Sequence, residues 1–135
     1  MKKIFVNGTF DVLHTGHLLL FEYAKSFGDY LIVAIDSDER VKEKKGPTRP
    51  INSLEDRAFM LSNLHHVDEV RTFGSDMDLK NLVKYYKPDI MIVGSDWKGK
   101  PVIGSEYAKE LKFFDRINEY STTKTIENII NRRNL

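Results

Sequence analysis

Two histidines that are three residues apart point to chemistry at one place in this sequence. His14 and His17 surround Gly16 in segment 8–17, which lies between a short apolar run and a stretch with helical spacing. The beginning of a helix presents unpaired backbone N–H groups and a partial positive charge, and both suit a phosphate group. A glycine there lets a ligand approach the backbone closely. Imidazoles at such a position can donate hydrogen bonds to phosphoryl oxygens during phosphoryl transfer without removing a proton.

Other interpretations of these histidines stay open on the residues alone. A lone histidine is usually structural or a solvated helix cap. Two histidines at this spacing can also bind a metal ion, but the sequence has no cysteine and shows no evident third ligand. We therefore expect no zinc site, and the lack of cysteine also excludes a disulfide framework and a thiolate nucleophile.

The elements that must position these groups alternate between strand and helix. Strands are expected at 4–6, 30–35, 67–73, 90–93 and 111–114, and helices at 18–27, 54–64, 78–86 and from a cap at Ser121 onward. This alternation predicts an α/β fold with an open, mostly parallel sheet and helices on both faces. Ligands of such sheets bind beyond the carboxyl ends of the strands. The site is therefore expected among segments 7–17, 36–49, 94–100 and 116–123.

Segment 40–49 differs in composition from the rest of that edge. It carries five basic residues and one acidic residue, together with Gly46 and Pro47. We expect it to be a basic, mobile loop at the ligand end of the sheet.

Length and charge limit the remaining possibilities. A chain of 135 residues predicts a single domain over 1–135. With 21 Lys and Arg against 20 Asp and Glu, the net charge of +1 creates no overall field that would recruit nucleic acid or an anionic membrane, so we expect neither partner. No run approaches the ~20 apolar residues that a membrane helix needs. The start of the chain is too polar for a signal peptide, which favours the cytoplasm.

Two motifs resemble those of a known enzyme family. Segments 8–11 (Gly-Thr-Phe-Asp) and 14–17 (His-Thr-Gly-His) resemble the signature of the HxGH nucleotidyltransferases, specifically the small cytidylyltransferases. Arg116, four further residues and then Ser-Thr-Thr at 121–123 are similar to the second signature of that family. The resemblance implies a Rossmann-like fold. It also implies that a phosphate oxygen of an acceptor attacks the α-phosphorus of a nucleoside triphosphate in line and releases pyrophosphate.

The resemblance also implies a role for each matching residue. The implied catalytic residues are His14, His17, Lys45 and Arg116. The implied nucleotide-binding residues are Gly8, Thr9, Phe10, Gly16, Asp96, Trp97, Ser121, Thr122 and Thr123. The implied acceptor-binding residues are Asp11, which otherwise fixes the turn, and Arg57.

Several of these roles have structural alternatives. Lys45 can be a solvated lysine, Arg57 can pair with an acidic neighbour on a helix surface, and Trp97 can either stack on a base or close the core. Mg²⁺ is implied as a ligand of the triphosphate, with no metal ligands from the protein. Relatives are commonly homodimers, and twofold symmetry is the usual arrangement of soluble oligomers, so a homodimer is expected.

Different segments of the sequence favour different substrates. Segment 94–100 and Arg116 are similar to glycerol-3-phosphate cytidylyltransferase, whereas segments 45–46, 49–52 and 103–105 are similar to the adenylyltransferase that activates heptose 1-phosphate. Our first interpretation is transfer from CTP to a small phosphorylated alcohol or sugar used in cell-surface polysaccharide synthesis. The alternatives are an ATP-dependent sugar-phosphate adenylyltransferase and a non-catalytic nucleotide-binding module.

Overall fold

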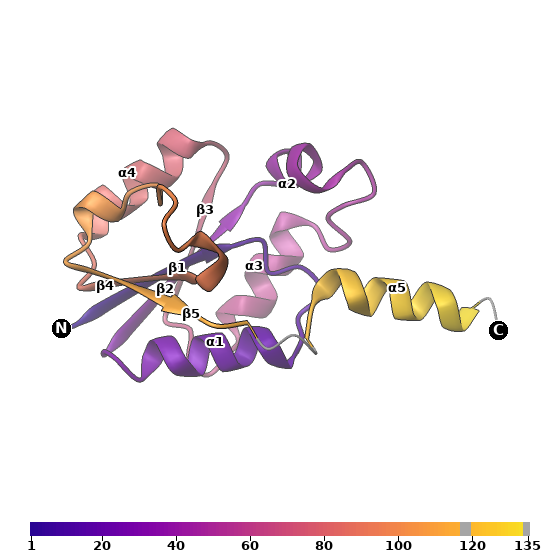
Figure 1. The fold of residues 1–135 in the computed structure, drawn as a ribbon, viewed down its shortest axis with the longest axis horizontal. Helices are drawn as coiled ribbons and strands as arrows, with labels where there is room; N and C mark the ends of the chain where they lie inside the picture. The colour runs from indigo at the N-terminus through magenta and orange to yellow at the C-terminus, as the bar shows by residue number, and fades with distance from the viewer. Residues whose placement is uncertain (117–119, 134–135) are drawn as a thin grey trace.

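The computed structural model describes residues 1–116 and 120–133, and its centre is a five-stranded parallel sheet (Figure 1). The strands are β1 (Lys3–Gly8), β2 (Tyr30–Asp36), β3 (Glu69–Phe73), β4 (Ile90–Gly94) and β5 (Glu110–Phe114). Their order across the sheet is β3-β2-β1-β4-β5, and each neighbouring pair is parallel. The expected open α/β sheet is confirmed.

Helices cover both faces of the sheet because the central strands are apolar on both sides. The helices are α1 (Thr15–Lys25), α2 (Asp38–Lys45), α3 (Leu54–Ser62), α4 (Asp76–Tyr86) and α5 (Thr122–Arg133), with short 3₁₀ turns η1 (Ser95–Trp97) and η2 (Ser105–Tyr107). One apolar cluster joins α1 and α3 to the sheet through Phe21, Ala24 and Leu61. On the other face, Leu79 and Val83 of α4 pack on the sheet. Parallel strands that are buried on both faces have nearly continuous apolar sequences. This is why these strands are recognisable in the sequence.

The register of the strands brings three chain segments to one edge. Gly8 at the end of β1 is paired with Ile35 of β2, and Val6 is paired with Ile92 of β4. The residues that follow β1, β2 and β4 therefore leave the sheet side by side. This edge is where the sequence places the ligand.

The expectation of a mobile loop over 40–49 is wrong for its first half, because α2 occupies Asp38–Lys45. The side chain of Ser37 accepts a hydrogen bond from the backbone N–H of Arg40, acidic residues occupy the first turn and lysines the last. These features stabilise a short helix through capping and the helix dipole. Val41 is buried, and Gly46 ends the helix with a φ of 102°. The run of basic residues hid this short helix from the sequence analysis.

Smaller differences concern the ends of elements. Helix α1 begins at Thr15 rather than 18, and α4 begins at Asp76 rather than 78, while β3 begins at Glu69 rather than 67. The expected cap at Ser121 is confirmed, since its hydroxyl accepts the backbone N–H of Lys124, and the Ser53 hydroxyl caps α3 in the same way through Asp56. Among the described residues, none of the helices is long and apolar enough to cross a membrane.

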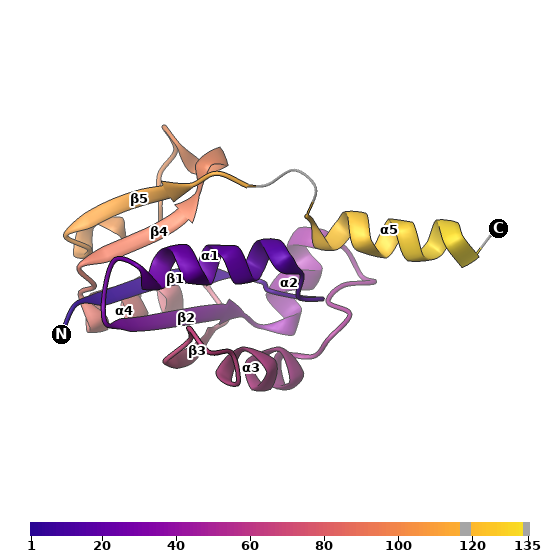
Figure 2. The same cartoon turned by 90° about the horizontal axis from the view of Figure 1, so that it is seen from below.

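Helix α5 extends away from the sheet, so that the two ends of the chain lie at opposite ends of the molecule (Figures 1 and 2). Its first residues nevertheless contact the turn after β1, because the Thr122 hydroxyl donates a hydrogen bond of 2.6 Å to the carbonyl of Asp11. The second sequence motif is thereby joined to the first.

Candidate functional site

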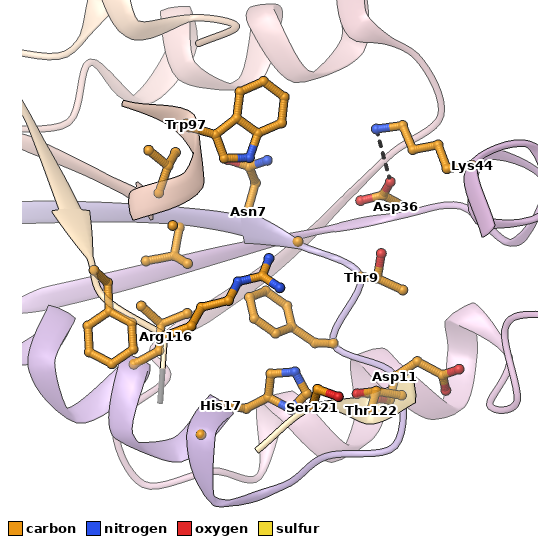
Figure 3. Close-up of a pocket in the computed structure, with 18 of the residues that line it drawn as sticks. Asn7, Thr9, Asp11, His17, Asp36, Lys44, Trp97, Arg116, Ser121 and Thr122 are labelled. Carbon is orange, nitrogen blue, oxygen red and sulfur yellow. Dashed lines mark hydrogen bonds and ion pairs between the residues drawn. The ribbon is translucent and has the colours of Figure 1, made fainter. Parts of the chain in front are cut away.

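A cavity of about 410 Å³ lies at the carboxyl ends of β1, β2 and β4. Both sequence motifs contribute to its walls. The predicted site residues that line it are Gly8, Thr9, Phe10, Asp11, His14, Gly16, His17, Lys45, Trp97, Arg116, Ser121, Thr122 and Thr123. Figure 3 shows His17 and Arg116 on the same side of the cavity as Ser121. Residues 117–119 of the second motif lie outside the described part of the chain.

The turn between β1 and α1 is built around Phe10. Phe10 and Val12 both have positive φ angles, 51° and 47°. The buried Phe10 ring lies 5.4 Å from the His17 ring and 5.0 Å from the Phe21 ring, measured between centroids. A Cβ at Gly8 would lie 2.9 Å from the Phe10 ring. The side chain of Phe10 therefore packs against the turn, and the backbone of the turn remains available for contact with a ligand.

Gly16 is required by the neighbouring side chains. A Cβ at this position would lie 2.9 Å from His14 Cε1 and 2.9 Å from Cβ of Tyr120. The sequence suggested that this glycine admits a ligand. The structure adds that it admits the His14 ring and the segment leading into α5.

The two imidazoles are stacked and oriented by the helix that begins between them. Their ring centroids are 3.8 Å apart, and the backbone N–H of His14 donates to Nδ1 of His17 at 3.2 Å. Because Nδ1 of His17 accepts this bond, the proton of the neutral ring is on Nε2. His17 therefore has an N–H donor available for a substrate oxygen.

The electrostatics of the cavity keep both histidines neutral. The pKa of His17 is lowered to about 3, first by burial and then by electrostatic interactions with His14, Lys45 and Arg116, while Asp11 opposes the shift. Burial and then Arg116 also lower the pKa of His14. A site crowded with positive charge resists adding another proton. It is correspondingly suited to an anion.

The cations come from separate parts of the chain. Lys45 lies at the end of α2, and its pKa is lowered by burial first and then by Arg49 and Arg116. The largely exposed side chain of Arg116 follows β5 and has Nε 3.9 Å from Oδ1 of Asp96. Asp96 itself does not line the cavity, so the structure places this predicted nucleotide contact beside Arg116 instead.

Asp11 and Arg57 both make structural contacts with segments that are distant in the sequence. The carboxylate of buried Asp11 accepts the backbone N–H groups of Ile51 and Asn52, at 2.6 and 2.9 Å. Arg57 is 0% exposed, and it is not among the residues that line the cavity. The expectation that Arg57 contacts the acceptor is corrected by this placement, because its guanidinium faces the protein interior.

Trp97 lies in η1 and lines the cavity, as Asn7 does (Figure 3). It is 45% exposed, which argues against the alternative that this ring closes the core. Stacking on a nucleobase remains a prediction.

Several polar residues that line the cavity were not assigned roles by the sequence analysis. They are Asn7, Asp36, Arg40, Lys44 and Arg49. Asp36 is buried at the end of β2, where its carboxylate lies 3.4 Å from Nε of Arg40 and 3.8 Å from Nζ of Lys44. The position of Asn7 and Asp36 at strand ends is the signal in the sequence that would have found them.

Comparisons with known proteins agree with this geometry. The model of the cytidylyltransferase-like family matches residues 5–128. The bifunctional protein HldE of Sulfurimonas denitrificans is 50% identical over 128 residues, which are 95% of this chain and 27% of that protein. The HldE protein of Campylobacter fetus is 48% identical over 126 residues, 93% of this chain and 27% of that protein. The chain thus spans about a quarter of the length of these curated relatives.

A solved structure shares the fold. The lipopolysaccharide core biosynthesis protein from Thermoplasma volcanium superposes with a TM-score of 0.69 at 27% identity, covering 84% of this chain and 97% of that one. Since the family model covers most of the sequence and both of its motifs meet in one cavity, this chain belongs to the cytidylyltransferase-like family.

Proposed function

We propose that the protein is a nucleotidylyltransferase that transfers the AMP moiety of ATP to a sugar phosphate such as heptose 1-phosphate. An acceptor phosphate oxygen attacks the α-phosphorus and forms a new P–O bond. The bond from the α-phosphorus to the bridging oxygen breaks, and pyrophosphate leaves with the electron pair. The observation that carries this proposal is that His14, His17 and Arg116, from opposite ends of the chain, line one cavity with the start of α5.

ATP replaces CTP as the favoured nucleotide for two reasons. Curated relatives at 50% and 48% identity are bifunctional HldE proteins, and we take the quarter of their length that this chain matches to be an adenylyltransferase part. The segments similar to heptose-1-phosphate adenylyltransferase also supply Lys45, Arg49 and Ile103 to the cavity wall. Transfer from CTP to glycerol 3-phosphate, our first interpretation from the sequence, becomes the alternative.

The residues around the cavity have different roles, which follow from their charge and position. In this proposal the neutral His17 donates from Nε2 to an oxygen of the α-phosphate, where negative charge shifts during transfer. His14 and Lys45 contact the same region, while Arg116 and the backbone N–H groups at the start of α5 hold the β- and γ-phosphates. A phosphate monoester is already an anion near neutral pH, so no general base is required.

Mg²⁺ is proposed to enter on the triphosphate. Most charged side chains that line the cavity are cationic, and both carboxylate oxygens of Asp11 already accept backbone N–H groups. The residues present therefore fit a metal ion that is held through substrate phosphates and water. When bound, the ion would neutralise charge on the phosphates. The cytoplasm, which holds the nucleoside triphosphate pool, remains the proposed compartment.

A homodimer also remains a proposal. Helix α5 projects from the molecule, and its Ile129 and Ile130 are both more than half exposed. Two copies related by a twofold axis would bury these side chains against each other.

Pyrophosphate release tests the reaction. We would measure it with ATP and with CTP, each combined with heptose 1-phosphate and with glycerol 3-phosphate. We expect kcat/KM to be highest for ATP with heptose 1-phosphate, by about tenfold or more over CTP. Faster turnover of CTP with glycerol 3-phosphate would restore the cytidylyltransferase alternative. Tight nucleotide binding without turnover of any pair would indicate a non-catalytic module.

A further inference from the structure

Arg49 is a buried arginine whose hydrogen-bonding capacity is largely unused. It lies between α2 and α3, lines the cavity and is only 9% exposed. Among the residues that the structure describes, its Nε and Nη2 have no hydrogen-bond partner. Its Nη1 donates a long bond of 3.4 Å to the hydroxyl of Thr123. A buried donor without a partner destabilises the protein, and a charged one does so more strongly, so this arrangement calls for an explanation.

Nearby Asp11 does not satisfy this guanidinium. The carboxylate of Asp11 lies 3.8 Å from Nε of Arg49, beyond hydrogen-bonding distance. Its two oxygens already accept the backbone N–H groups of Ile51 and Asn52. Asp11 therefore reduces the cost of the buried charge and fixes the chain beside it, while Nε and Nη2 of Arg49 have no partner among the described residues.

Arg57, a second buried arginine a few residues away, shows what a structural arginine looks like in this fold. Its Nε donates to the carbonyl of Asn52 at 3.1 Å, its Nη1 to the carbonyl of Thr9 at 3.0 Å and its Nη2 to Asp38 at 2.7 Å. Each of its nitrogens has a partner. The contrast between the two arginines suggests that the partner of Arg49 is a substrate.

The surroundings of Arg49 indicate the charge of that substrate. Arg57 and Asp11 tie the segment after Arg49 to the turn that carries the histidines. The positive charge of Arg49 contributes to the lowered pKa of Lys45, so the two cations face the same region. Converging cations with free N–H donors suit a phosphoryl group, which an arginine binds through its planar fork.

We propose that Arg49 binds a phosphoryl group of a substrate in this cavity, and that Asp11 and Arg57 position it for this role. Rotation of the guanidinium turns Nε and Nη2 toward the bound oxygens. The inference rests on the proposed function, which supplies two sources of a phosphoryl group, the nucleotide polyphosphate and the acceptor phosphate. The bond to Thr123, at the start of α5, favours the polyphosphate.

Calorimetric titration with inorganic pyrophosphate and with ATP, both with Mg²⁺, directly measures binding of the polyphosphate, which is the first source of a phosphoryl group. Arg49→Gln is expected to weaken pyrophosphate binding roughly 10- to 100-fold, the range for a charged hydrogen-bonded contact. Arg49→Lys, which keeps the charge but lacks the fork, is expected to lose less. Arg132→Gln is the matched control, because it removes the same charge from an exposed position in the last turn of α5.

The KM for heptose 1-phosphate tests whether Arg49 binds the acceptor phosphate, which is the second source of a phosphoryl group. A rise of similar size in this KM, with pyrophosphate affinity unchanged, would assign Arg49 to the acceptor phosphate and still support the proposal. Pyrophosphate affinity and acceptor KM that both stay within about twofold of the Arg132→Gln control would overturn it. Should Arg49→Gln not fold, as judged by thermal unfolding, unchanged values for Arg49→Lys would overturn it equally.

The same titration separates this inference from the proposed function. Wild-type protein that binds pyrophosphate but catalyses no transfer would contradict the reaction, while the variants would still decide the role of Arg49. Wild-type protein that binds neither pyrophosphate nor ATP would contradict the proposed function, whereas Arg49 variants that match the Arg132→Gln control in a wild-type background that binds and turns over ATP would contradict only the role of Arg49.

Discussion

His17 shows how its surroundings fix both the charge and the hydrogen-bonding direction of one side chain. Burial and the nearby cations Lys45 and Arg116 keep the ring neutral, and the backbone N–H of His14 occupies Nδ1. A neutral ring with its proton on Nε2 can donate to a phosphoryl oxygen, as the proposed function requires, without repelling the other cations. The structure thus supplies a physical reason for a histidine at this position, whereas the motif supplies only its residue type.

The first prediction concerns catalysis by His17. His17→Ala removes the Nε2 donor, so we expect kcat to fall by about 100-fold or more while the affinity for ATP changes little. Steady-state pyrophosphate release and calorimetric ATP binding would measure the two effects. The exposed His65 offers the matched control His65→Ala, which should behave as the wild type. Near-normal turnover of His17→Ala would remove His17 from the mechanism.

The second prediction concerns the pH dependence of stability. The pKa of His17 is lowered from 6.5 to about 3 on folding, so the unfolded chain binds more protons in this interval. The stabilising effect of a neutral His17 is complete above pH 6.5 and is lost as the pH falls toward 3. We expect the free energy of unfolding to fall by roughly 1–2 kcal/mol between pH 7 and pH 5 through this group.

Urea denaturation at the two pH values would measure this effect. In His17→Gln the loss between pH 7 and pH 5 should be smaller than in the wild type, whereas in His65→Gln it should be unchanged. An equal loss in His17→Gln would show that His17 is not held neutral by folding.

At the scale of elements, the site depends on ties between segments that are distant in sequence. Asp11 binds the backbone before α3, Arg57 of α3 binds the carbonyl of Thr9, and Thr122 of α5 binds the carbonyl of Asp11. The turn between β1 and α1 is therefore held by two other helices. Its positive φ angles at Phe10 and Val12 persist because these contacts fix the backbone.

The third prediction tests whether Arg57 is such a tie or a substrate contact. Arg57→Met leaves the carbonyls of Thr9 and Asn52 without their donors, so we expect the free energy of unfolding to fall by roughly 2–4 kcal/mol. Arg132→Met, at an exposed position in the last turn of α5, should change the free energy of unfolding by no more than about 0.5 kcal/mol. Urea denaturation would compare them. Wild-type stability of Arg57→Met together with a raised acceptor KM would instead make Arg57 a substrate contact.

At the scale of the whole molecule, the two ends of the chain have different structural roles. The N-terminal strand is the centre of the sheet, whereas α5 leaves the sheet after contacting the cavity (Figure 2). An isolated amphipathic helix of this length is marginally stable in water. A partner surface for its isoleucines would therefore also stabilise the part of α5 that lines the site.

The fourth prediction concerns that partner surface. If two copies associate through α5, replacing Ile129 and Ile130 by Lys should shift the mass measured by light scattering after size exclusion from dimer to monomer. Met77→Lys, at another exposed apolar residue on α4, is the control and should leave the mass unchanged. A dimer that survives the α5 substitutions would show that another surface joins the copies, and a monomeric wild type would contradict the homodimer.

The alternating fold was predictable from the amino-acid sequence alone, which also supplied the phosphate-binding hypothesis for the two motifs. Strands buried on both faces, such as 30–35 and 90–93, are recognisable because their apolar composition reflects their environment directly. Glycines and histidines at 8–17 indicated phosphate binding at the beginning of a helix, whereas Ser-Thr-Thr at 121–123 was assigned to the nucleotide by its resemblance to a family signature. These features are local, and local patterns can be read without coordinates.

Only the tertiary structure decided what the charged residues do. Nothing in the sequence distinguishes Arg57, whose nitrogens all have partners, from Arg49, whose donors are largely unused. Nor does it show that Asp11 binds the backbone forty residues later. The physical reason is that the burial and partners of a charge depend on which distant segments pack around it. That packing, unlike helical or strand periodicity, leaves no regular pattern along the chain.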